Sequence, residues 1–257
     1  MSSRTDYLPP DGLRTRGTVI VVPGRGETRA TYARFAARLQ YDAYQVIVTD
    51  PPDVDPASSA GYLGELGRLL AEVVAGAVGE LPGGVARPLV LAGSDVAAAG
   101  IAAAVARTDP SAVWWPEAVV LAGLPGYDVR AEGGWDEELS IRTRCPVHRD
   151  VLVSDEAIRR GMLAGAVPDK LLDAAYQSRA PVPHLLLVGD ADPLADRDAL
   201  AGFAKTLPTA RLAVVSGAHH DVLNDLQHRS VAAEVVMFLE ALRTGLVPAI
   251  AVAASGW

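Results

Sequence analysis

The sequence has a single cysteine, Cys145, in 257 residues. One cysteine cannot form an internal disulfide bond, and disulfide bonds are typical of proteins that fold in oxidising compartments. The opening residues, MSSRTDYLPP, also lack the charged segment and following apolar segment of a secretory signal peptide. We therefore expect a protein of the reducing cytoplasm.

Clusters of lysine and arginine are absent, and the formal net charge is −8 at pH 7. Nucleic acids and anionic membranes attract a concentrated positive surface, so neither is an expected partner. Long apolar runs are absent too: residues 246–254 contain a proline and reach about half of the roughly 20 residues that span a bilayer. We expect no membrane span and a small-molecule substrate, and the sequence leaves the oligomeric state open.

The sequence does contain a repeated alternation of short apolar runs and helical segments. The runs are rich in Val, Ile and Leu and apolar on both faces, which is typical of parallel strands covered by helices on each side. The expected strands are 18–22, 44–49, 88–92, 117–123, 184–189 and 211–217. This pattern predicts an α/β fold with a mostly parallel central sheet flanked by helices.

The chain length suits one such domain. Residues 1–125 and 184–257 are predicted to form its core. Residues 126–183 exceed one crossover connection and are predicted to be a short helical cap inserted over the strand ends. Because ligands bind at the carboxyl ends of the strands in such sheets, we expect the functional residues directly after strands.

Asp95 follows the third expected strand in the stretch LVLAGSDVAAAG, where the chain turns into a helix. In a nucleophile elbow, small residues lie two positions to either side of the turn. Centring the turn on Asp95 puts Gly93 and Ala97 at these positions, whereas centring it on Ser94 puts the β-branched Val96 at one of them. Asp95 is therefore expected at the tip. The alternative is that its carboxylate only caps the helix.

Asp192 and His220 follow the fifth and the last expected strands. Asp192 lies where a carboxylate can orient an imidazole ring, and Asp190 is the other candidate for this role. The simpler explanation of GDADP is that Gly, Asp and Pro are common in turns without any catalytic role. Loop histidines are commonly solvated, but a turn residue, an acid and a histidine after successive strands match the order of a nucleophile, an orienting acid and a base. We therefore expect Asp95, Asp192 and His220 to be the catalytic residues.

Two loops carry a resemblance to a known family. PGRGE at 23–27 resembles the His-Gly-x-Gly-Glu loop of the monoacylglycerol lipase and lysophospholipase-like group of α/β-hydrolases, and HHDVLND at 219–225 resembles its His-Glu-x-Leu-Asn-Glu/Asp segment. The resemblance covers most of 18–242 and implies the α/β-hydrolase fold. It also implies that His220 is the catalytic histidine, that Asp192 is the acid, and that the backbone N–H groups of Arg25 and Val96 form an oxyanion hole.

The chain departs from this group at three places. Asp95 replaces the nucleophilic serine, Pro23 replaces the histidine of the first loop, and the Gly-His-Gly-x-Ser turn expected after the second strand is absent. Pro23 leaves the backbone donors of the oxyanion hole in place. The PGRGE loop also lacks the spacing of phosphate-binding motifs, so no nucleotide and no other cofactor is expected.

An aspartate at the elbow changes the chemistry. In haloalkane dehalogenases and epoxide hydrolases, whose elbows this one resembles, the carboxylate attacks an sp³ carbon and a histidine-activated water then opens the ester. Attack on an ordinary ester is less favourable, because the alkoxide that must leave is a stronger base than the attacking carboxylate by roughly 12 pK units, or roughly 16 kcal/mol. Each oxyanion-hole donor offsets only about 3 to 4 kcal/mol of this difference. Val96 stands where dehalogenases place a tryptophan, which disfavours dehalogenation.

We expect a cofactor-independent hydrolase that acts on a small, largely apolar ester, lactone or epoxide through an Asp-His-Asp site. A non-hydrolytic lyase or cyclase, and a catalytically degenerate member that binds a ligand or partner, are the alternatives. Asp95 is left open as nucleophile, as general base, or as a sign of lost activity.

No metal is expected, because Cys145 and His148 are too few for a closed zinc site, and RTR at 142–144 is expected to face solvent. The possible pocket residues are Ser94, Tyr127, His148, Tyr176 and His219.

Overall fold

The computed structural model describes residues 4–52, 58–80, 84–247 and 250. The other residues of the predicted core ranges lie outside this described part. The described residues form one seven-stranded sheet in the order β1-β3-β2-β4-β5-β6-β7. Strands β2 to β7 are parallel to their neighbours, and only β1 pairs antiparallel, with β3. The predicted α/β fold with a mostly parallel sheet is confirmed.

The six predicted strands lie within two residues of the observed ones at either end. The strands are β1 (Arg4–Tyr7), β2 (Gly17–Val22), β3 (Tyr44–Thr49), β4 (Leu89–Ser94), β5 (Ala118–Ala122), β6 (His184–Gly189) and β7 (Ala210–Val215). The helices are α1 (Ala33–Tyr41), α2 (Ser59–Glu80), α3 (Val96–Val105), α4 (Trp135–Arg142), α5 (Pro146–Ser154), α6 (Asp169–Tyr176), α7 (Arg197–Thr206) and α8 (His228–Arg243). Short 3-10 turns lie at Arg29–Tyr32 and Met162–Ala164.

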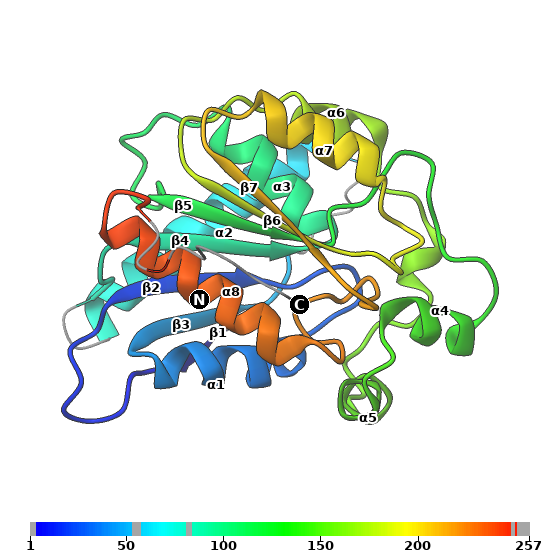
Figure 1. The fold of residues 1–257 in the computed structure, drawn as a ribbon, viewed down its shortest axis with the longest axis horizontal. Coiled ribbons are helices and arrows are strands. Elements are labelled where there is room, and N and C mark those ends of the chain that lie inside the picture. The colour runs from blue at the N-terminus through cyan, green and yellow to red at the C-terminus, as the bar shows by residue number, and fades with distance from the viewer. Residues whose placement is uncertain (1–3, 53–57, 81–83, 248–249, 251–257) are drawn as a thin grey trace.

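Helices cover both faces of the sheet, with α1 and α8 on one side and α2, α3, α6 and α7 on the other (Figure 1). Residues of β2 to β5 are buried throughout, and their side chains alternate between the two apolar clusters that the helices close. Each cluster removes apolar surface from water, which is the main favourable term in folding. The sheet is therefore a rigid support from which the strand-end loops project.

The α4–α5 segment lies beyond the carboxyl ends of the strands and is bonded to their loops (Figure 1). The backbone N–H groups of His220 and Asp221 donate to the carbonyls of Ile141 and Arg142, at 3.1 and 2.9 Å. Helix α6, which the predicted cap also includes, packs against α3 instead. The cap boundaries at 126 and 183 stay a prediction.

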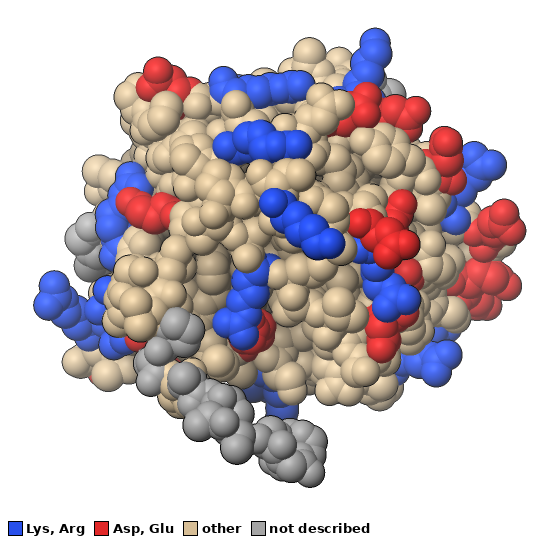
Figure 2. Space-filling view, turned by 45° about the horizontal axis from the view of Figure 1, so that its top comes forward, with Lys and Arg blue, Asp and Glu red and all other residues tan. Residues whose placement is uncertain are grey.

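No helix within the described residues has the length and apolar character needed to cross a membrane. On the face in Figure 2, basic and acidic side chains are scattered among other residues, and no broad patch of one sign is visible.

Candidate active site

Asp95 occupies a strained turn between β4 and α3. Its backbone angles, φ 52° and ψ −123°, lie in a region that L-residues rarely adopt, at a cost of about 1–3 kcal/mol. The turn is tight, because a Cβ added to Gly93 would lie 2.7 Å from the backbone of Ala97. Ser94 is the last residue of β4 and is buried. The strained position is therefore that of Asp95, and Ser94 belongs to the strand before it.

His220 lies between two carboxylates. Its Nδ1–H donates to Asp192 Oδ2 at 3.0 Å, and its Nε2 lies 3.3 Å from Asp95 Oδ1. All three side chains are buried. Burial alone would lower the pKa of His220, but the charge and hydrogen bond of Asp192, followed by the nearby carboxylate of Asp95, raise it to about 10. Asp190 plays no part here, because its carboxylate accepts from the Gly217 N–H at 2.6 Å.

Arg25 holds the carboxylate of Asp95 by three hydrogen bonds. Its Nε and backbone N–H reach Oδ2 at 2.7 and 2.9 Å, and its Nη2 reaches Oδ1 at 2.9 Å. Gly24 allows this approach, since a Cβ there would lie 2.9 Å from the Cβ of Asp95. The backbone N–H of Arg25, which was predicted to be an oxyanion-hole donor, thus donates to the carboxylate of Asp95. Val96, the second predicted donor, is the first residue of α3, where backbone N–H groups lack helical partners.

The four buried charges around Asp95 cancel. Burial would raise the pKa of Asp95, but Arg25 and His220 outweigh it and hold the pKa well below its usual range. Two carboxylates, Asp95 and Asp192, then face one guanidinium and one imidazolium. Because His220 bridges the carboxylates and Arg25 covers the first of them, the arrangement is a closed, electrically neutral centre.

The other predicted pocket residues make contacts outside this centre. Tyr127 and Tyr176 stack with ring centroids 5.7 Å apart, and their hydroxyls donate to Asp173 Oδ1 and the Pro125 carbonyl, both at 3.0 Å. Neither hydroxyl is therefore bonded to the carboxylate of Asp95. His219 Nδ1 bonds Asp225 at 3.1 Å. His148 is buried on α5, with its Nε2 at 2.9 Å from Asp221 Oδ2.

Sequence reasoning missed a second buried charged cluster beside this centre. Arg142 is only 1% exposed and Thr143 is buried as well, so the expectation that 142–144 faces solvent is wrong for both, and only Arg144 of the three is exposed. The Nη2 of Arg142 donates to the Arg25 carbonyl at 2.7 Å and to Glu138 Oε1 at 2.8 Å. Glu138 and Arg142 are four residues apart on α4, and this spacing was the available signal for the pair.

Comparison with known proteins identifies the fold. No family model and no curated protein sequence matches the chain. Among solved structures, the chain is similar to monoglyceride lipase from Saccharomyces cerevisiae, at TM-score 0.72 and 15% identity over 93% of this chain and 91% of that chain. It is equally similar, at TM-score 0.72, to monoacylglycerol lipase from Paleococcus ferrophilus, at 17% identity over 94% of this chain and 99% of that chain.

A putative non-heme bromoperoxidase from Mycobacterium tuberculosis is also similar, at TM-score 0.64 and 14% identity over 94% of this chain and 96% of that chain. The chain has the α/β-hydrolase fold. The identities are low, and because one fold hosts many chemistries, function has to be argued from the site.

Proposed function

We propose that the chain is a cofactor-independent hydrolase in which Asp95, His220 and Asp192 form the catalytic centre, observed in a closed form held by Arg25. The observation that carries the proposal is His220, held by Asp192 through Nδ1 and facing Asp95 through Nε2. A ring fixed in this way can exchange a proton at the atom next to the turn carboxylate.

The substrate class that suits a carboxylate nucleophile is a small, largely apolar epoxide. An Asp95 oxygen attacks a ring carbon, the C–O bond of the ring breaks, and the imidazolium of His220 gives its proton to the alkoxide. A water molecule then gives a proton to neutral His220 and attacks the carbonyl carbon of the enzyme ester. The N–H groups of Arg25 and Val96 stabilise the oxyanion. Collapse breaks the ester C–O bond, the departing alkoxide takes the proton of the new Asp95 carboxylic acid, and the diol leaves Asp95 as a carboxylate and His220 as the imidazolium.

Opening of the closed form requires the Arg25 side chain to leave Asp95. Two charge-assisted hydrogen bonds from the guanidinium then break, each worth about 1.5–3 kcal/mol. The backbone N–H of Arg25 remains to serve the oxyanion. A substrate that displaces the guanidinium therefore needs an acceptor group of its own for it.

A ligand-binding protein without turnover is the second candidate function. The observation that favours it is that Arg25 engages both carboxylate oxygens of Asp95 in a buried ion pair. Direct attack of water, with His220 as general base, is a third route that suits esters and lactones.

Turnover in oxygen-18 water separates these routes. Epoxides, esters and lactones are screened, and active reactions are followed by mass spectrometry of the peptide 88–107. Covalent catalysis labels Asp95, and His220→Gln traps the alkyl ester on the same peptide. Labelled product with an unlabelled peptide over many turnovers would reject the nucleophile and leave general-base chemistry. Asp192→Asn should abolish turnover, with Asp190→Asn in the same loop as the matched control.

A further inference from the structure

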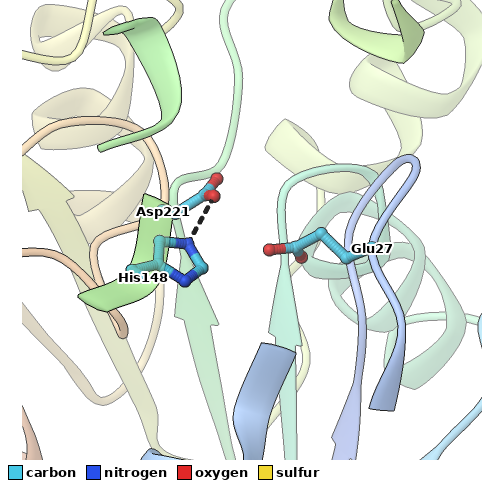
Figure 3. Close-up of side chains that lie close together, drawn as sticks. All are labelled: Glu27, His148 and Asp221. Carbon is cyan, nitrogen blue, oxygen red and sulfur yellow. Dashed lines mark hydrogen bonds and ion pairs between the residues drawn. The ribbon is translucent and has the colours of Figure 1, made fainter. Parts of the chain in front are cut away.

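Three ligand-type side chains meet outside the catalytic centre. Glu27 follows β2, His148 lies on α5, and Asp221 directly follows His220. One ligand atom from each lies within 4.8 Å of the others, and all three side chains are buried. Figure 3 shows the carboxylate of Glu27 facing the ring of His148 and the carboxylate of Asp221.

Glu27 has an unsatisfied oxygen on this side. Its Oε2 accepts from the Gly24 N–H at 2.8 Å and from the hydroxyl of Tyr32. Its Oε1 is buried and has no hydrogen-bond partner among the described residues. Carboxylate oxygens left unpaired in an interior are costly, so a missing electropositive partner is indicated between Glu27 and His148.

The local charges point to a divalent partner. Arg142 is already paired with Glu138 through two bonds of 3.0 and 2.8 Å, and it reaches Asp221 Oδ1 only at 3.4 Å. The carboxylates of Glu27 and Asp221 lie close together in this buried cluster, and a divalent ion between them offsets the charge of both.

We propose that Glu27, His148 and Asp221 bind a divalent transition-metal ion, with Zn²⁺ as the preferred one. One imidazole and two carboxylates suit zinc, whereas Mg²⁺ and Ca²⁺ need about six or more oxygen ligands. The 2.9 Å between His148 Nε2 and Asp221 Oδ2 is close to the roughly 3.3 Å that separates two ligands of tetrahedral zinc. Asp221 then binds through Oδ2 and keeps Oδ1 for Arg142, while a carboxylate oxygen of Glu27, which lies within 4.8 Å of the other two ligand atoms, moves closer.

The ion would tie together three segments that are far apart in the sequence. It would join the loop after β2, the loop that carries His220, and helix α5 of the predicted cap. With three protein ligands, the ion keeps a fourth position for water or another small ligand. The proposal is independent of the hydrolase proposed above, because none of the three ligands is Asp95, His220 or Asp192.

Metal content and thermal stability of the full chain test this proposal. Protein stripped with a chelator is loaded with Zn²⁺ or Co²⁺, freed of excess metal, and analysed by elemental mass spectrometry. We expect one ion per chain, and a rise in Tm on the order of 5 °C at about 100-fold excess over the Kd. Absorption of bound Co²⁺ in the visible range reports the coordination number.

Glu27→Gln and His148→Gln should each lose the bound ion and the Tm rise. His219→Gln is the matched control, because His219 is also paired with a carboxylate, that of Asp225, but lies outside the cluster. Equal retention by the two ligand variants would place the ion elsewhere and overturn the proposal. The unmodified protein decides the question even if a variant misfolds, since failure to retain either metal also overturns it.

Discussion

Replacing Arg25 by methionine tests the closed centre directly. At the 2.7 Å separation of Arg25 Nε and Asp95 Oδ2, the attraction is about 6 kcal/mol with an effective dielectric constant of 20. Desolvation of both ions offsets part of this, but the substitution leaves the carboxylate buried without its main partner. Losing one member of a buried pair costs about 3–5 kcal/mol. We therefore expect Arg25→Met to lower the free energy of unfolding by about 3–5 kcal/mol, and Tm by about 10 °C.

Urea unfolding followed by circular dichroism measures this change, and a double-mutant cycle isolates the pair. Arg25→Met with Asp95→Asn should be more stable than the sum of the single changes by at least about 2 kcal/mol. Arg29→Met is the control, because its ion pair with Asp50 is partly exposed, at 32% and 45%, and should contribute less than about 1 kcal/mol. An Arg25→Met cost no larger than that of Arg29→Met would refute the reasoning.

Three further outcomes are expected. Burial lowers the pKa of His184 to about 4 from an unfolded value of 6.5, so stability should fall as pH drops from 6.5 toward 4, by at most about 1.4 kcal/mol per pH unit. His184→Asn, whose Nδ2–H can replace Nδ1–H as the donor to the Val182 carbonyl, should flatten that slope in acid denaturation, and an unchanged slope would contradict the assignment. The raised pKa of His220, about 10, predicts that direct water attack, which needs neutral His220 from the start, speeds up from pH 7 to pH 10. The covalent epoxide route starts from the imidazolium and should not gain over this range, so a flat profile with chemistry rate-limiting would reject His220 as the base of direct water attack. Gly93→Ala should lower the free energy of unfolding by about 1–3 kcal/mol, because the added methyl group overpacks the elbow. Gly202→Ala on α7 is the control, since its added methyl group meets no atom within 4 Å and should be neutral or stabilising. Equal Tm values for the two variants would refute the crowding between Gly93 and Ala97.

Much of the fold could be predicted because its strands are apolar on both faces. The exception is β1, whose residues Arg4–Tyr7 are half-buried at the sheet edge and carry polar side chains, so no apolar run marked it. The residue at the elbow followed from a steric argument about Gly93 and Ala97, which depends only on neighbours in the sequence. The catalytic role of Asp95 stays a prediction.

The contacts that the sequence did not predict join side chains far apart in the chain. Arg25 and Asp95 are 70 positions apart, and the contact between Arg142 and Asp221 spans 79. No periodicity links such positions, because the approach of two loops depends on the whole sheet beneath them. Arg142 was wrongly expected at the surface because an arginine-rich segment is usually solvated. Its burial depends on the local pair with Glu138 and also on Asp221 and the Arg25 carbonyl, which are far away in the sequence.

The two backbone bonds from His220 and Asp221 to the carbonyls of Ile141 and Arg142 have a consequence for motion. They join the C-terminal end of helix α4, where carbonyls lack helical partners, to the loop that carries His220. Lifting of α4 therefore exposes both amides and releases His220 in the same step. Hydrogen exchange at these two amides accordingly measures how often α4 separates from the His220 loop, and the rate of that opening sets an upper limit on how fast a ligand that requires it can enter.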